Sequence, residues 1–113
     1  MSKIVLFVLD LETGRPGAGV EASVSFLTSS LQYELIHNSI TRKDGCFTTH
    51  IASHSQFPTP EFRVLVQAGD YFKAHNKVTF YSEICIDICW DGEQDMVLPL
   101  LLSSHGYTTY RGN

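Results

Sequence analysis

The chain has 113 residues, of which 43% are hydrophobic and 18% are charged, and its formal net charge at pH 7 is −4. This composition is typical of one globular domain over residues 1–113 and excludes an intrinsically disordered chain. Scattered basic residues with an acidic balance argue against nucleic-acid binding, and no apolar run approaches the roughly 20 residues of a membrane helix.

Short β-compatible runs separated by turn residues follow one another along the chain. The first run, KIVLFVLD, is β-branched and apolar. The Asp44-Gly45 pair predicts a hairpin between the runs on either side of it. A short helix fits only at residues 69–75. In chain order, the sequence predicts strands at residues 3–10, 20–28, 31–41 (one strand or two), within 42–51 around Asp44-Gly45, 62–69, 78–90, 96–103 and 107–112.

About eight short strands at hairpin intervals indicate an all-β fold, an antiparallel sandwich. Two of the runs, IVLFVL (4–9) and VLPLLL (97–102), are apolar on both faces, whereas a strand of a sandwich has one face toward water. Pro99 cannot donate to a ladder and is typical of edge strands and bulges. We therefore expect the second apolar faces to be covered by another subunit, because bare apolar edges promote aggregation.

Cysteine and histidine usage gives no sign of a metal site. The cysteines Cys46, Cys85 and Cys89 are odd in number and lack framework spacing, which indicates a reducing cytoplasm. Cys85 and Cys89 are about 13 Å apart at strand rise, too far for a disulfide, and we interpret them as packing residues. We expect no metal and no cofactor, because the cysteines and the histidines lack zinc-ligand spacing. These histidines are His37, His50, His54 and His75.

Five segments spread over the chain, in the same order as in the family, resemble the 5-hydroxyisourate hydrolases, the enzymatic relatives of transthyretin. The closing residues are similar to that family's C-terminal signature, LLLSPYGYSTYRGS. The segments are VLDLETGRPGAGV (8–20), TRKDGCF (41–47), AGDYFKAH (68–75), FYSEICIDI (80–88) and VLPLLLSSHGYTTYRGN (97–113).

The resemblance implies a transthyretin-like sandwich of two four-stranded antiparallel sheets with one short helix near residues 71–75. It also implies a homotetramer, built as a dimer of dimers, with a channel lined by the first strand and the last two strands. These are the strands whose composition calls for a covered second face. In the family, the final tetrapeptide folds into the active site.

This chain departs from the family at positions that carry the chemistry. Phe7 stands where the hydrolases have the histidine of H-V-L-D, and Cys46 stands where D-G-R supplies an arginine. Val97 replaces the histidine of H-V-P-L-L-L, and Asn113 replaces the final serine. Hydrolysis of a ureide ring needs a base that titrates near neutral pH and a fixed cation. We therefore expect 5-hydroxyisourate hydrolysis to be absent or very weak.

The altered site is expected to be largely apolar, with a few polar groups at its inner end. Such a lining favours an apolar or aromatic small-molecule ligand larger than a ureide. The residues expected to line the ligand site are Phe7, Leu9, Val97, Pro99, Leu101, Thr108 and His105. The residues expected to act in catalysis are Tyr110, Arg111, Cys46 and Asn113, the last through its carboxylate.

Three functions remain open: a repurposed enzyme acting on an apolar molecule, a carrier like transthyretin, and a degenerate member kept for assembly. The retained Tyr110-Arg111-Gly112, which transthyretin lacks, favours the enzyme. Simpler roles are open too. Cys46 could be a small buried residue that only fills space, and His105 could be an exposed turn residue. Arg111 could pair with a carboxylate across the interface. Asp10 is expected to shape the turn after the first strand.

Overall fold

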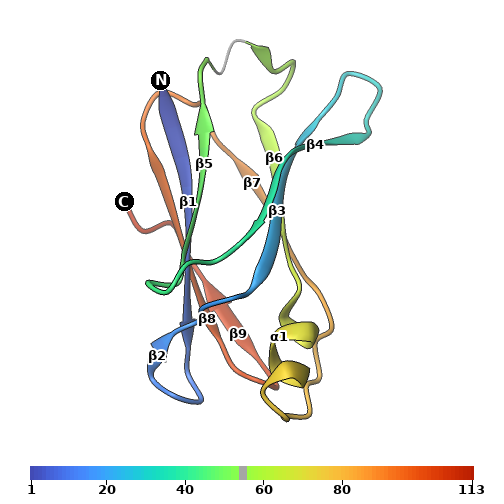
Figure 1. The fold of residues 1–113 in the computed structure, drawn as a ribbon. Helices are drawn as coiled ribbons and strands as arrows, with labels where there is room; N and C mark the ends of the chain where they lie inside the picture. Colours follow the sequence, from blue (N-terminus) through green and yellow to red (C-terminus); the bar gives the residue numbers. More distant parts are fainter. Residues whose placement is uncertain (54–55) are drawn as a thin grey trace.

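The computed structural model describes residues 1–53 and 56–113 (Figure 1). His54, one of the histidines considered as ligands, lies outside the described residues. No helix in the described ranges has the length and apolar character needed to cross a membrane. In chain order the elements are β1 (Ser2–Asp10), β2 (Arg15–Pro16), β3 (Glu21–Leu27), β4 (Tyr33–Ile40), β5 (Cys46–Ile51), β6 (Glu61–Val66), α1 (Ala68–Ala74), β7 (Ile84–Cys89), β8 (Met96–Leu102) and β9 (Tyr107–Thr109).

The strands form two sheets that face each other, as the sequence predicted (Figure 1). The first sheet has the order β2-β1-β8-β9, and β5 also pairs with β1. The second sheet has the order β4-β3-β6-β7. All pairs are antiparallel except β1 and β8, which are parallel. This exception corrects the purely antiparallel prediction. Because β1 and β8 are joined through the second sheet and not by a hairpin, nothing local fixes their relative direction.

The inner faces of the two sheets form the core. Period-two alternation puts Ile4, Leu6 and Val8 of β1 inside, and each of these side chains has 0% exposure. The second sheet contributes an equivalent set that includes Val24 and Val64, also with 0% exposure. The helix α1 follows β6, as expected near residues 69–75, and its Phe72 completes the core.

The Asp44-Gly45 turn is present, but the predicted hairpin is wrong. β4 pairs with β3 and β5 pairs with β1, so the turn carries the chain from one sheet to the other. Gly45 has a φ of +80°, which favours glycine. A Cβ there would lie 2.6 Å from the Val8 carbonyl oxygen, so the turn packs directly on β1. A turn sequence therefore predicts the local backbone conformation but does not determine whether the strands on either side of the turn pair with each other.

Two predicted strands are shorter than their composition suggested. The strand expected at residues 78–90 begins only at Ile84, because the preceding segment crosses the end of the sandwich, where the Phe80 N–H donates to the Ser104 carbonyl (2.8 Å). Cys85 and Cys89 lie exposed on β7 and are not packing residues. The last strand ends at Thr109, because the next position of β8 is Pro99, which has no N–H to donate to the ladder.

β8 also differs from the edge-like strand that Pro99 suggested, because it lies between β1 and β9. Pro99 is opposite Phe7 in the parallel pair with β1. On the other side, the β9 ladder begins at Leu100, and at Pro99 the Thr109 hydroxyl donates to the carbonyl (2.7 Å). Proline is therefore accommodated at the point where regular pairing with β9 stops.

Candidate functional site

The outer face of the first sheet carries a continuous row of apolar side chains. Strand partners share a face, so the registers place Cys46, Phe7 and Pro99 in one row across β5, β1 and β8. A second row joins Leu9 to Leu101 and Leu101 to Thr108 on β9. Phe7, Leu9 and Leu101 are half-buried in one protomer, in contrast to the fully buried residues between them. This face is where the sequence predicted a ligand site, and it lies outside the core.

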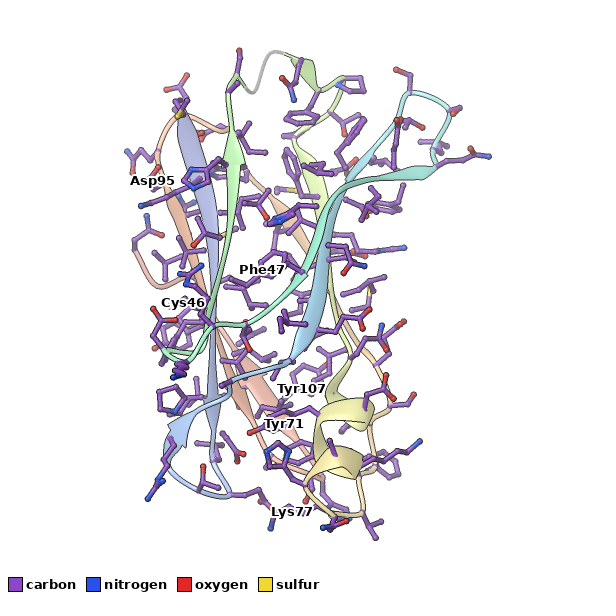
Figure 2. All side chains as sticks on the ribbon, in the orientation of Figure 1. Cys46, Phe47, Tyr71, Lys77, Asp95 and Tyr107 are labelled. Carbon is purple, nitrogen blue, oxygen red and sulfur yellow. The ribbon has the colours of Figure 1, made fainter. Side chains whose placement is uncertain are left out.

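Cys46 and its neighbour Phe47 illustrate how the alternation works on β5. Figure 2 shows Phe47 directed toward the interior and Cys46 on the opposite side of the strand. Phe47 is 1% exposed. Val97 lies on the same outer side as Cys46, opposite Val5, one pleat away from the pair of Phe7 and Pro99. Three of the four substituted family positions therefore share one small region of the outer face.

The residues that follow β9 lie against the free part of β8. The Gly112 N–H donates to the Val97 carbonyl (2.8 Å), and the Val97 N–H donates to Asn113 Oδ1 (3.2 Å). The Asn113 amide also donates to the Asp95 carbonyl (2.6 Å). A Cβ on Gly112 would lie 3.0 Å from Pro99 Cγ and 3.1 Å from Val97 Cγ1, so a glycine allows this close approach. The fourth substituted position, Asn113, therefore adjoins Val97.

Tyr110 and Arg111 line a different hollow. It is a cavity of about 320 Å³ at the open edge of the sandwich, between β7 and β8, with Ile86, Cys89, Met96 and Leu98 in its walls. Ile86, Met96 and Leu98 belong to the inner faces of the sheets. Both side chains of the pair are exposed, and no ion pair joins Arg111 to another described residue. Within one protomer, the retained Tyr-Arg pair thus adjoins β7, while Gly112 and Asn113 adjoin the outer face.

The environment of Cys46 does not activate its thiol. Burial and the neighbouring Asp44 carboxylate raise the pKa of Cys46, and the nearby Arg42 opposes this shift only in part. Arg42 is itself paired with Asp44, with 3.8 Å between Nε and Oδ1. A reactive thiol needs a depressed pKa. These contacts favour the small-filler interpretation over a nucleophile.

His105 and Thr108 lie toward the far end of the first sheet. His105 is exposed in the turn between β8 and β9, where its Nδ1 is 2.9 Å from the Ser104 hydroxyl. Thr108 is opposite Leu101 and also exposed. Asp10 shapes the turn after β1, as expected: its Oδ1 accepts the backbone N–H of Glu12 (2.8 Å).

Sequence reasoning assigned no site or structural role to three polar side chains near these elements. The Tyr71 hydroxyl donates to Asp10 Oδ2 (2.7 Å), joining α1 to the end of β1. Lys3 and His50 are strand partners on the outer face, at the end opposite Leu9. Because side chains alternate along a strand, the outward position of Phe7 also predicts an outward position for Lys3. No local sequence signal predicts that Lys3 is the strand partner of His50. In residues 1–53 and 56–113, no group of three or more His, Cys, Asp or Glu side chains could hold a metal ion.

Comparisons with known proteins agree with this architecture. The chain is 30% identical over 107 residues to a 5-hydroxyisourate hydrolase of Salmonella dublin, covering 94% of this chain and 77% of that protein. The solved structure of Klebsiella pneumoniae 5-hydroxyisourate hydrolase superposes with a TM-score of 0.83 at 26% identity, covering 99% of this chain and 100% of that one. Sea bream transthyretin in complex with thyroxine also has a TM-score of 0.83, at 25% identity, covering 96% and 92% of the two chains. A family profile described as HIUase/Transthyretin matches residues 4–112, and the chain belongs to this family.

Proposed function

We propose that this protein binds an apolar or aromatic small molecule between subunits, on the outer face of the sheet that contains β1 and β8, and has lost most 5-hydroxyisourate hydrolysis. The observation that carries the proposal is the shared position of Phe7, Cys46 and Val97 on that face. None of the three can act as a base near neutral pH or supply a fixed cation. The burial of apolar ligand surface would provide most of the affinity.

A homotetramer, as the resemblance implies, is part of this proposal. The half-buried side chains of Phe7, Leu9 and Leu101 on the outer face support it, because a contiguous apolar face on a globular domain marks an interaction or binding surface. A reducing, cytoplasmic location also belongs to the proposal, and the three free cysteines are consistent with it.

Residual hydrolysis through other side chains is less well supported. His50 is the histidine of β5 on the same face, but it lies two pleats from Cys46, about 13 Å along the strand. Within one protomer, His50 is therefore outside hydrogen-bond reach of a group held at Phe7 and Cys46, and proton abstraction requires such contact.

A repurposed enzyme is the second candidate, and the retained Tyr110-Arg111 pair favours it. Both residues line the cavity between β7 and β8, where a phenol and a guanidinium adjoin apolar walls. This candidate requires that a bound compound be converted, and that Tyr110→Phe or Arg111→Ala abolish the conversion. The carrier requires that the compound be recovered unchanged after incubation with extracts of the source organism.

The test is a hydrolysis assay on 5-hydroxyisourate with three samples. The unaltered protein should show rates near the uncatalysed reaction, and a relative such as the Klebsiella pneumoniae enzyme serves as the positive control. The triple variant Phe7→His, Cys46→Arg, Val97→His should gain activity, because it restores the base and the cation. Thyroxine, the ligand named for the sea bream structure, serves as the apolar probe, and the triple variant should bind it more weakly than the unaltered protein. Hydrolysis by the unaltered protein at the rate of the positive control would overturn the proposal.

A further inference from the structure

The turn between β4 and β5 places a guanidinium beside the outer face of the first sheet. The Arg42 N–H donates to the Cys46 carbonyl (2.9 Å), and the Gly45 N–H donates to the Arg42 carbonyl (2.9 Å). Arg42 therefore lies directly across the turn from Cys46. A Cβ on Gly45 would lie 3.3 Å from Phe7 Cε1, so the same turn packs against the Phe7 ring. The backbone of Arg42 is thus held next to two of the substituted positions of the proposed ligand site.

The Arg42 side chain extends to the outer side of β5. Arg42 Nη2 donates to the Thr48 hydroxyl (3.4 Å). Thr48 is the strand partner of Val5 and lies on the same face as Cys46, two residues further along β5. The charge of Arg42 also reaches Cys46, because it opposes the rise in the pKa of this thiol that burial and Asp44 cause. The guanidinium therefore adjoins the apolar outer face.

This guanidinium is accessible to a ligand and only loosely paired. The Arg42 side chain is 57% exposed. Its Nε lies 3.8 Å from Asp44 Oδ1, and the same oxygen accepts the Cys46 N–H (2.9 Å). A guanidinium has five N–H donors in a planar fork. The contacts with Asp44 and Thr48, the two found in the described part of the chain, leave most of these donors available to an anion.

The rest of the outer face does not oppose a negative charge. The outward positions of β1, β5 and β8 are apolar or neutral as far as Lys3 and His50, which end the face, and none of these fully described positions carries a carboxylate. Lys3 adjoins Asp95, whose Oδ1 accepts its backbone N–H (3.0 Å), so the charge at that end is mixed. An apolar face with an accessible guanidinium at its edge is complementary to an amphipathic anion.

We propose that Arg42 determines the specificity of the proposed ligand site, and that the ligand is an apolar or aromatic body carrying a carboxylate or sulfonate group. The body packs against Phe7 and Val97, and the anionic group accepts hydrogen bonds from the Arg42 guanidinium. Arg42 thus supplies, from across the turn, the cation that Cys46 cannot supply. This inference rests on the proposed function and adds to it the charge of the ligand and the residue that recognises this charge.

The test uses two fluorescent probes that share one body and differ in charge. The first, 8-anilinonaphthalene-1-sulfonate, is an anion, and the second, N-phenyl-1-naphthylamine, is neutral. Both emit more strongly in apolar surroundings. Arg42→Gln should weaken binding of the sulfonate roughly fivefold, the scale of a partly exposed charge contact, and leave the affinity for the neutral probe unchanged. Added salt should weaken binding of the sulfonate alone.

Two further variants separate the guanidinium of Arg42 from charge in general. Arg63→Gln removes a guanidinium from the outer face of the second sheet and should leave the affinities for both probes unchanged. Arg42→Lys keeps the charge but loses the planar fork, so it should retain part of the affinity for the sulfonate. Equal effects of Arg42→Gln and Arg63→Gln would overturn the proposal.

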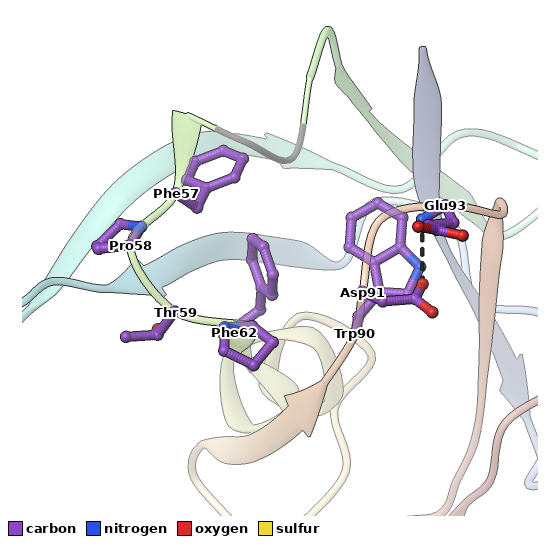
Figure 3. A pocket seen from close by; sticks show the side chains of 8 residues that line it. Phe57, Pro58, Thr59, Phe62, Trp90, Asp91 and Glu93 are labelled. Atoms are coloured by element: carbon purple, nitrogen blue, oxygen red, sulfur yellow. Dashed lines mark hydrogen bonds between the residues drawn. The ribbon is translucent and has the colours of Figure 1, made fainter.

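Other places where a probe could bind differ in charge. The cavity of about 330 Å³ at one end of the sandwich has Asp91 and Glu93 as the charged residues of its described lining, so it disfavours the sulfonate (Figure 3). Arg111 lines the cavity between β7 and β8, and Lys3 ends the outer face. If Arg111→Gln or Lys3→Gln weakened binding of the sulfonate and Arg42→Gln did not, the proposal would be wrong.

The outcomes also distinguish this inference from the proposed function. The neutral probe should bind the unaltered protein, and it should bind the triple variant Phe7→His, Cys46→Arg, Val97→His more weakly. If it does so while Arg42→Gln leaves the affinity for the sulfonate unchanged, the apolar site stands and the role of Arg42 is rejected. If neither probe binds the unaltered protein at millimolar concentration, both proposals are rejected.

Discussion

The outer faces of the two sheets differ in what they present. On the second sheet, Arg63 and Asp87 are opposite each other on β6 and β7 and form a bidentate pair, with distances of 2.7 Å and 3.1 Å. The Arg63 guanidinium also lies 3.8 Å from the centroid of the Tyr33 ring. On the first sheet, the outward-facing strand partners of β1 and β8 include Phe7 with Pro99 and Leu9 with Leu101. One outer face is suited to water, and the other has the composition of a buried surface.

This difference shows that alternation alone does not make a sheet face polar. Both sheets bury their inner faces to the same degree, so folding of one protomer accounts for only half of the apolar residues of β1 and β8. We infer that the other half serves assembly, ligand binding or both, as proposed above. The functional argument therefore depends on the contrast between the two outer faces more than on any single side chain.

The largest effect is expected from a charge placed on the outer face of the first sheet, compared with the same charge placed on the outer face of the second sheet. Leu101→Lys should abolish the proposed tetramer, because an unpaired charge at a subunit interface costs about 3–5 kcal/mol. Leu65→Lys makes the same change on the outer face of the second sheet and should leave the assembly intact. Light scattering after size-exclusion chromatography gives the mass of each species. A monomeric native protein, or equal disruption by both variants, would contradict the interpretation.

The sequence predicted the features that depend on local chemistry. Alternation in β1 and β8 identified both the core face and the second apolar face, and the run around Tyr71 identified the helix. The pairing of strands is not local, because period two says which face a residue occupies and not which strand lies beside it. The parallel pair of β1 and β8, and the passage of Asp44-Gly45 between sheets, therefore escaped prediction.

The same limit applies to the candidate site. Phe7, Cys46 and Val97 were brought together by a family resemblance, and the registers place them on one face. The direction taken by Tyr110 and Arg111 depends on where β9 ends, and YTTYRG has uniform strand propensity through that point. The bond between Tyr71 and Asp10 spans 61 positions of sequence, and no motif signals it.

The hydrogen bond between Tyr71 and Asp10 helps to hold the two sheets together. Tyr71 follows the second sheet and Asp10 ends β1 of the first, with exposures of 7% and 3%. Tyr71→Phe should lower the free energy of unfolding by about 1–3 kcal/mol, because a buried carboxylate oxygen loses its donor. Tyr81→Phe, at a residue with 38% exposure, is the control and should have little effect.

The effect of Tyr71→Phe should also depend on pH. Burial, followed by the bond to Asp10, raises the pKa of Tyr71 above its ordinary value of 10.0. A group with a raised pKa in the folded state stabilises the fold below its unfolded pKa, and this contribution is lost as the pH rises above 10. The difference in unfolding free energy between the native protein and the variant should be constant from about pH 7 to 9 and shrink at higher pH. A difference that grows above pH 10 would contradict the assignment.

The smallest effect is expected on the polar outer face. Arg63→Gln should lower the free energy of unfolding by less than about 1 kcal/mol, because the Arg63 and Asp87 side chains are 32% and 53% exposed and water screens the pair. The bond from Arg63 lowers the pKa of Asp87 below its ordinary value of 3.8, so the contribution is present above pH 4 and is lost as the pH falls below it.

Arg42→Gln removes a weaker ion pair, in which Arg42 Nε lies 3.8 Å from Asp44 Oδ1 and both side chains are more than half exposed. This variant should lower the free energy of unfolding by still less than Arg63→Gln. Urea unfolding of both variants at about pH 7 and pH 3 tests this order. If Arg63→Gln instead changed the mass of the assembly, the second sheet would also carry an interface, and the contrast between the two faces would have to be abandoned.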